Sequence, residues 1–211
     1  MSEEDKAPSY FEQVKLHQAN VEMRAKRSDT PWFLYTDGSG QVDVPGASAH
    51  VVFNRHTGTF DHGVSTSSRT SVERAELQAL LNGLVFIAEN SKVLDSRRAI
   101  EEGHEKRPEI IWVGDRENLI LSVLRGYDGL TLNRRRNNLD MWAALSYWEQ
   151  YFDILPLQRP RNVVGAQGVA DMLCGAARKS LKQFLDDIHP EIVNRLTPPQ
   201  AQPSDKPSQF E

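Results

Sequence analysis

The hydrophobic pattern along the chain predicts five strands. Each expected strand is a short apolar run rich in aromatic or β-branched residues, bounded by glycine, proline or polar turn residues. Only four residues separate the second run from the third, which predicts an antiparallel hairpin. Pro156 in the last run favours an edge or bulge position, because proline has no backbone N–H to donate. The five segments are 32–37, 47–54, 59–65, 109–113 and 153–158.

Apolar residues at helical spacing predict the helices between and after these strands. The strongest pattern runs from about Ser71 to Asn90 and has a Thr70-x-x-Glu73 capping box at its start, so it is the expected core helix. A charged stretch, 95–107, either extends this helix or forms an insertion. Three further helices are expected to begin at Asp115, near Leu139 and near Gln167.

The expected order of elements, β-β-β-α-β-α-α-β-α, determines the fold class. Three antiparallel strands followed by βα units predict an α/β fold with a five-stranded mixed sheet and helices on both faces. This domain is expected over 31–189. Residues 1–30 form an N-terminal extension with a weakly amphipathic helix that could dock a protein partner, and the proline-rich residues 190–211 are expected to be disordered.

Composition narrows the class of protein. The chain has 211 residues, of which 39% are hydrophobic and 26% charged, and this suits one globular domain with flanking segments. Its net charge of −4 gives no sign of a polyanion partner, although totals are blind to local patches. A single cysteine excludes an intramolecular disulfide, and no stretch approaches the roughly 20 apolar residues of a membrane span. We therefore expect a soluble, monomeric, cytoplasmic protein.

Four acidic residues stand at the boundaries of the expected elements: Asp37, Glu76, Asp115 and Asp171. If the first and fourth strands are parallel neighbours, Asp37 and Asp115 lie side by side. Crowded carboxylates disfavour folding unless a cation compensates them, and hard oxygen ligands without histidine or cysteine favour Mg²⁺ or Mn²⁺. Two such ions about 3.5–4 Å apart can activate water and stabilise the leaving oxygen of a phosphodiester.

Each acid also has a simpler structural interpretation. Asp37-Gly38 is a common turn pair, Asp115 could cap a helix, and Asp171 could complement a helix dipole. Glu76 differs, because it borders the buried face of the core helix, where an unpaired carboxylate is unusual. The four acids in this order are much more specific than any one of them.

The residues around these acids resemble type 1 ribonuclease H. The resemblance covers roughly 31–185, and only its first two motifs are individually specific. The similar segments are Tyr35-Thr36-Asp37-Gly38-Ser39, Glu73-Arg74-Ala75-Glu76-Leu77, Val113-Gly114-Asp115, Asn138-Leu139-Asp140-Met141-Trp142 and Ala170-Asp171-x-Leu173.

This resemblance implies an endoribonuclease that cleaves the RNA strand of RNA–DNA hybrids by a two-metal mechanism. Asp37, Glu76, Asp115 and Asp171 would be the metal-binding catalytic acids, with two Mg²⁺ or Mn²⁺ ions. Glu76 and the backbone around Gly38 and Ser39 would lie near the ribose 2′-hydroxyl, which distinguishes RNA from DNA.

Basic residues near these motifs are expected to bind the substrate. Segment 115–182 holds ten basic and seven acidic residues within a chain of net negative charge, so this face could hold phosphates. The three consecutive arginines at 134–136 could instead be a solvated loop that binds no phosphate. The expected substrate-binding arginines are Arg74, Arg134, Arg135, Arg136, Arg159 and Arg161.

Three departures from the family pattern keep other functions open. The loop 159–168 has no histidine, where many members have one that assists product release or proton transfer. Val72-Glu73 replaces a common Asn-Asn pair, and Arg116 replaces the serine that usually follows the fourth-strand acid. A DNA nuclease on the same fold, or a catalytically degenerate domain that binds nucleic acid or protein, remains an alternative. Convergence of the carboxylates would favour an enzyme.

Overall fold

The computed structural model describes residues 10–27, 31–41, 44–125, 137–159 and 165–187. The expected proline-rich tail, 190–211, lies outside the described residues, as do Arg161 and the arginines at 134–136. Among the described residues, no helix is long and apolar enough to cross a membrane.

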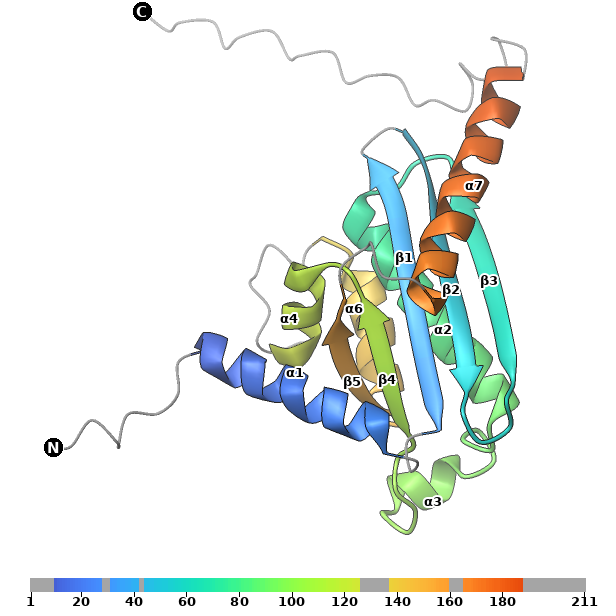
Figure 1. Ribbon diagram of the computed structural model, residues 1–211. Coiled ribbons are helices and arrows are strands. Elements are labelled where there is room, and N and C mark those ends of the chain that lie inside the picture. The colour runs from blue at the N-terminus through green and yellow to red at the C-terminus, as the bar shows by residue number, and fades with distance from the viewer. Residues whose placement is uncertain (1–9, 28–30, 42–43, 126–136, 160–164, 188–211) are drawn as a thin grey trace, which may run out of the picture.

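A five-stranded mixed sheet forms the centre of the molecule, which confirms the predicted fold class. Its strand order is β3-β2-β1-β4-β5 (Figure 1). The first three strands pair antiparallel, and β4 pairs parallel to both β1 and β5. Because Pro156 lies in the edge strand β5, its predicted edge position is confirmed. The strands are β1 (Trp32–Gln41), β2 (Val44–Asn54), β3 (Phe60–Ser67), β4 (Glu109–Gly114) and β5 (Asp153–Gln158).

The larger core lies on one face of the sheet, under three helices, and a fourth, short helix adds one buried residue to it. It buries alternate strand residues such as Leu34 and Trp112 against leucines of the central helix. The hydroxyl of Ser71 accepts a hydrogen bond from the backbone N–H of Arg74, so Ser71 is the N-cap and the expected cap at Thr70 was wrong by one residue. The four helices are α2 (Val72–Asn90), α3 (Arg97–Glu101), α4 (Glu117–Arg125) and α6 (Leu139–Trp148).

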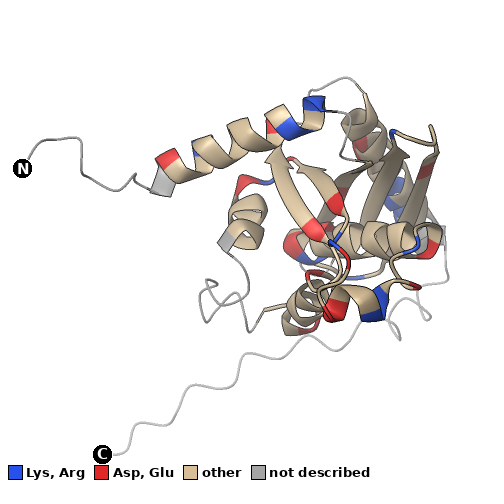
Figure 2. Cartoon of the chain, turned by 90° about the horizontal axis from the view of Figure 1, so that it is seen from below, with Lys and Arg blue, Asp and Glu red and all other residues tan. Residues whose placement is uncertain are grey.

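The charged stretch after α2 is an insertion and does not lengthen that helix. Helix α2 ends at Asn90, and a turn leads into the short helix α3, which lies below the lower end of the sheet in Figure 1. Figure 2, which views the molecule from that end, shows the described basic and acidic residues interspersed over several elements.

Two helices cover the opposite face of the sheet. Helix α7 (Ala166–Asp187) crosses β1, β2 and β3, and helix α1 (Tyr10–Lys26) lies over β4 and β5 (Figure 1). Val21 of α1 is buried against strand residues, and Gln18 covers the edge of β5. The Gln18 amide donates to the carbonyl of Pro156 at 3.3 Å and accepts from the N–H of Gln158 at 2.9 Å. The N-terminal helix is therefore part of the folded unit, and a protein partner for its outer side stays a prediction.

Candidate metal centre

Strand register places two of the predicted acids side by side. In the parallel pairing of β1 with β4, Tyr35 lies opposite Val113. Asp37 and Asp115 each follow two residues later, just beyond the end of this pairing: Asp115 comes directly after β4, whereas β1 continues past Asp37 to Gln41, so the expected end of this strand at Asp37 was wrong. Their proximity follows from the pairing predicted between the first and fourth strands.

A glycine allows the third acid to join them. A Cβ atom at Gly38 would lie 2.3 Å from the backbone nitrogen of Glu76 and 2.6 Å from the carbonyl carbon of Ala75. Only glycine lets the first turns of α2 approach β1 this closely. The backbone N–H of Gly38 also donates to the Glu76 carboxylate. The Asp-Gly pair therefore determines where Glu76 lies.

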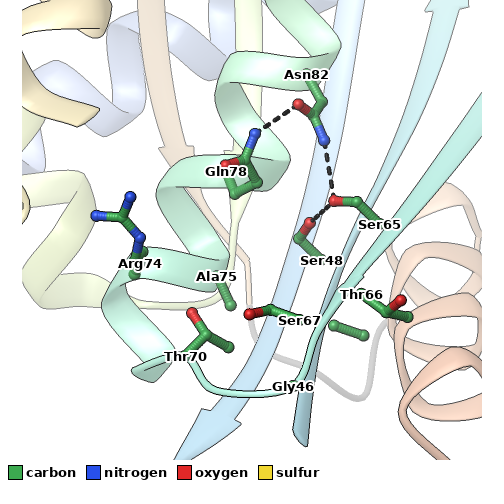
Figure 3. A pocket seen from close by; sticks show the side chains of 11 residues that line it. Gly46, Ser48, Ser65, Thr66, Ser67, Thr70, Arg74, Ala75, Gln78 and Asn82 are labelled. Carbon is green, nitrogen blue, oxygen red and sulfur yellow. Dashed lines mark hydrogen bonds between the residues drawn. The ribbon is translucent and has the colours of Figure 1, made fainter. Parts of the chain in front are cut away.

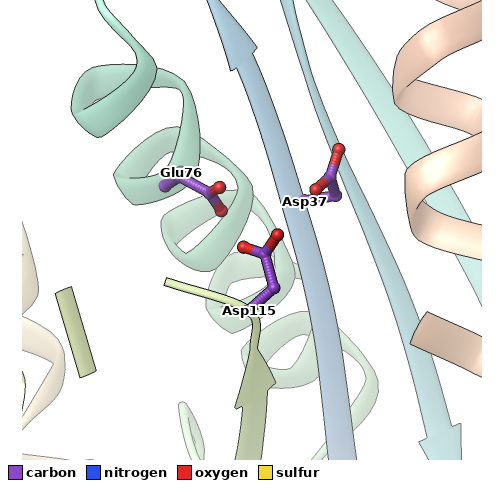
Figure 4. Close-up of side chains that lie close together, drawn as sticks. All are labelled: Asp37, Glu76 and Asp115. Carbon is purple, nitrogen blue, oxygen red and sulfur yellow. The ribbon is translucent and has the colours of Figure 1, made fainter. Parts of the chain in front are cut away.

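Asp37 on β1, Glu76 on α2 and Asp115 in the turn after β4 lie close together (Figure 4). One carboxylate oxygen of each lies within 4.8 Å of the others. Asp37 is 3% exposed, Glu76 is 1% exposed and Asp115 is half-buried. Such a set of hard oxygen donors can hold a divalent cation.

The surroundings of Glu76 disfavour the charged form of its carboxyl group, which a bound cation would stabilise. Burial raises the pKa of Glu76 well above its usual range, and the charges of Asp37 and Asp115 raise it further. The positive charge of Arg116 acts in the opposite direction without reversing the effect. The Oε1 atom of Glu76 is buried and has no hydrogen-bond partner among the described residues. A cation would supply both the ligand contact and the charge that this carboxylate lacks.

The structure does not bring the fourth predicted acid, Asp171, into this group. Asp171 lies on α7 with an exposed side chain. Helix α7 is nevertheless fixed beside the site, because the side chain of the buried Gln167 donates to the carbonyl of Thr36 at 2.9 Å. Asp171 as a metal ligand stays a prediction.

The single cysteine lies next to the carboxylates but cannot act as a thiolate. Cys174 is buried, and its thiol donates to the carbonyl of Ala47 at 3.2 Å. Burial raises the pKa of this thiol, and the charge of Asp37 and a hydrogen bond with it raise the pKa further. Cys174 therefore stays protonated, and its contacts hold α7 against β1 and β2.

Two of the predicted substrate-binding arginines already have carboxylate partners. Both terminal nitrogens of Arg74 donate to Asp140 of α6, at 2.9 and 2.5 Å. Arg159 forms an ion pair of 3.1 Å with Glu22 of α1. Both ion pairs are exposed to solvent, and the binding of substrate by Arg74 and Arg159 stays a prediction. Glutamine and arginine positions on α7 (Gln167, Arg178) were not anticipated from the sequence, since isolated polar residues on a helix give no signal of a contact with β1.

A polar pocket, called the polar seam below, lies between α2 and the β2–β3 hairpin. This pocket of about 370 Å³ is crossed by a chain of hydrogen bonds from Gln78 to Asn82, from Asn82 to Ser65, and between Ser65 and Ser48 (Figure 3). Arg74 points away from this network (Figure 3). Because these side chains already hydrogen-bond to one another, they give no reason to place a ligand in this pocket.

Comparison with known proteins finds similarity in structure. No protein-family model and no curated protein sequence matches the chain. One similar structure is that of LC11-RNase H1, a protein isolated from compost, in complex with an RNA/DNA hybrid. Its TM-score is 0.54 at 15% sequence identity, and the match covers 71% of this chain and 98% of that one. The N-terminal RNase H domain of Rv2228c from Mycobacterium tuberculosis has a TM-score of 0.51 at 16% identity, covering 72% and 96%. RNase H1 from Halobacterium salinarum has a TM-score of 0.50 at 19% identity, covering 71% and 98%. The chain therefore has the ribonuclease H fold.

Proposed function

We propose that this protein is a type 1 ribonuclease H, a metal-dependent endonuclease that hydrolyses the RNA strand of RNA–DNA hybrids. The convergence of Asp37, Glu76 and Asp115 within 4.8 Å carries the proposal. A domain that had lost catalysis would have no reason to keep three carboxylates crowded and largely buried, since they oppose folding. The fold and the sequence motifs support the choice of phosphodiester chemistry.

The residues of this chain have distinct tasks in the proposed reaction. Asp37, Glu76 and Asp115 hold Mg²⁺ or Mn²⁺, and Asp171 completes the ligand set from the exposed face of α7. When bound, two such ions lower the pKa of a water nucleophile and stabilise charge on the leaving oxygen. Glu76 and the backbone at Gly38 and Ser39 contact the ribose 2′-hydroxyl, which restricts cleavage to RNA.

A panel of labelled duplexes tests this assignment. The wild type should cleave the RNA strand of a hybrid in Mg²⁺ or Mn²⁺, and EDTA should abolish cleavage. Asp37→Asn should lose activity while it keeps the wild-type circular dichroism spectrum. Gln78→Ala, in the polar seam, is the matched control and should cleave normally.

The same panel separates the alternatives. Cleavage of duplex, single-stranded or branched DNA with an intact hybrid would identify a DNA nuclease on this fold. Binding of nucleic acid without cleavage in either metal would contradict the proposal and favour a degenerate binding domain. Equal activity in wild type and Asp37→Asn would contradict the proposal, because the converging carboxylates would then not be needed for cleavage.

A further inference from the structure

Helix α7 carries a half-buried arginine beside the metal centre. The Nη1 atom of Arg178 donates to the hydroxyl of Ser39 at 2.9 Å. Ser39 follows Asp37 by two residues on β1, so both side chains lie on the face of the strand that α7 covers. The Arg178 guanidinium is therefore held beside the end of β1 that carries a metal-site acid.

Arg178 differs from the neighbouring cations in what it contacts. Arg74 and Arg159 are neutralised by Asp140 and Glu22. Among the described residues, the Ser39 hydroxyl is the hydrogen-bond partner of Arg178, and no carboxylate lies within ion-pair distance of it. A guanidinium has five N–H donors, so one whose described partner is a single hydroxyl has donors left for an anion.

In the part of the chain that the structure describes, nothing covers α7 midway between Asp171 and Arg178. Residues 171, 175 and 178 share one helix face, because they are four and seven positions apart. Position 175 is a glycine, and a Cβ atom there would meet no described atom within 4 Å. The exposed Lys182 lies further along the same face. A clear path of about 10 Å along the helix axis therefore joins Asp171 to Arg178.

We propose that Arg178 binds a backbone phosphate of the nucleic-acid strand that lies across the metal centre. This inference rests on the proposed function, and it adds a phosphate subsite on α7. At an axial rise of about 3.4 Å per nucleotide, the path from Asp171 to Arg178 spans about three nucleotides. Ser39 fixes the guanidinium before the substrate arrives, which reduces the ordering cost of binding.

Binding measured without cleavage tests the subsite. A fluorescein-labelled RNA–DNA hybrid is titrated with the full chain in EDTA at several salt concentrations, and anisotropy gives the Kd. Arg178→Gln should weaken binding about five- to tenfold. It should also reduce the slope of log K against log salt by roughly 0.7 to 0.9, the value of one phosphate contact. Arg178→Lys should bind with intermediate affinity, since it keeps the charge but loses the planar fork.

Lys179→Gln is the matched control, because it removes one positive charge from the adjacent, exposed position of the same helix. It should change the Kd less than twofold. Equal weakening by both variants would overturn the subsite in favour of general electrostatics, and a wild type that fails to bind the hybrid would also overturn it. A wild type whose binding depends on Arg178 but which cleaves no hybrid in Mg²⁺ would support the subsite and contradict only the proposed function. Cleavage with no dependence of binding on Arg178 would contradict only the subsite.

Discussion

The two sides of the metal centre are held in place by different means. Asp37, Glu76 and Asp115 are positioned by strand register and by a helix packed directly on Gly38, and two of the three are almost fully buried. On the other side, α7 presents an exposed Asp171 and is attached to β1 and β2 through the side chains of Gln167, Cys174 and Arg178. Backbone pairing and packing thus position the three converging acids, whereas side-chain hydrogen bonds position α7 with Asp171. We infer that the buried acids determine cation binding and that α7 tunes the fit of the substrate.

Removal of one of the three converging acids should have the largest effect. Asp115→Asn should lower the rate of hybrid cleavage by about 10³-fold or more, which corresponds to about 4 kcal/mol of lost transition-state stabilisation. Single-turnover kinetics in Mg²⁺ would measure the loss. A fall of less than tenfold would mean that the crowded carboxylates are not the catalytic ligands.

The close approach at Gly38 predicts the next largest effect. Gly38→Ala should destabilise the protein by about 3 kcal/mol, because the new methyl group overlaps the backbone of α2. Urea unfolding of the metal-free protein would measure the change. A loss below about 0.5 kcal/mol would show that α2 can shift away from β1 at little cost.

Replacement of the exposed acid should matter less than replacement of one of the three converging acids. Asp171→Asn should lower cleavage about 10- to 100-fold, because α7 can still hold the substrate while the cation keeps the three converging carboxylates. The same kinetics would compare it with Asp115→Asn. Equal losses in the two variants would contradict the difference between the two sides.

The raised pKa of Glu76 predicts how the stability of the metal-free protein varies with pH. The unfolded chain releases this proton near the ordinary value of 4.5, whereas the folded protein retains it to higher pH. This contribution to stability is therefore complete below pH 4.5 and is lost as pH rises toward the folded pKa. Glutamine does not ionise, so Glu76→Gln should not lose stability in this way. Its free energy of unfolding minus that of the wild type should therefore increase from pH 4 to pH 8 in EDTA. A constant difference across this range in urea unfolding would contradict the prediction.

The smallest effect is expected on the exposed side, at Gly175. Gly175→Ala should stabilise the protein by about 0.5–1 kcal/mol, since the new methyl group enters open space and alanine favours the helix. Thermal unfolding would measure it. Destabilisation would show that this face of α7 is packed against another part of the chain.

The same contrast explains what the sequence could and could not predict. Asp37 and Asp115 could be placed together from the sequence because matching positions of two paired parallel strands lie side by side. The partner of Arg74 could not, since Asp140 is 66 residues away and only the packing of α6 against α2 brings them together. The contact of Arg178 with Ser39 could not be predicted either, because it depends on where α7 crosses β1. Local pattern therefore predicted the buried side of the site but not the tertiary contacts of the exposed side.

The central claim is that Asp37, Glu76 and Asp115 form a divalent-cation site. Thermal unfolding with increasing Mn²⁺ tests it directly, without reference to activity. The wild type should gain stability as RT ln(1 + [Mn²⁺]/Kd), about 2.7 kcal/mol at a hundredfold excess over the Kd, and Asp37→Asn should gain far less. No stabilisation of the wild type, or equal stabilisation of both proteins, would contradict the metal site and the catalytic mechanism proposed for it.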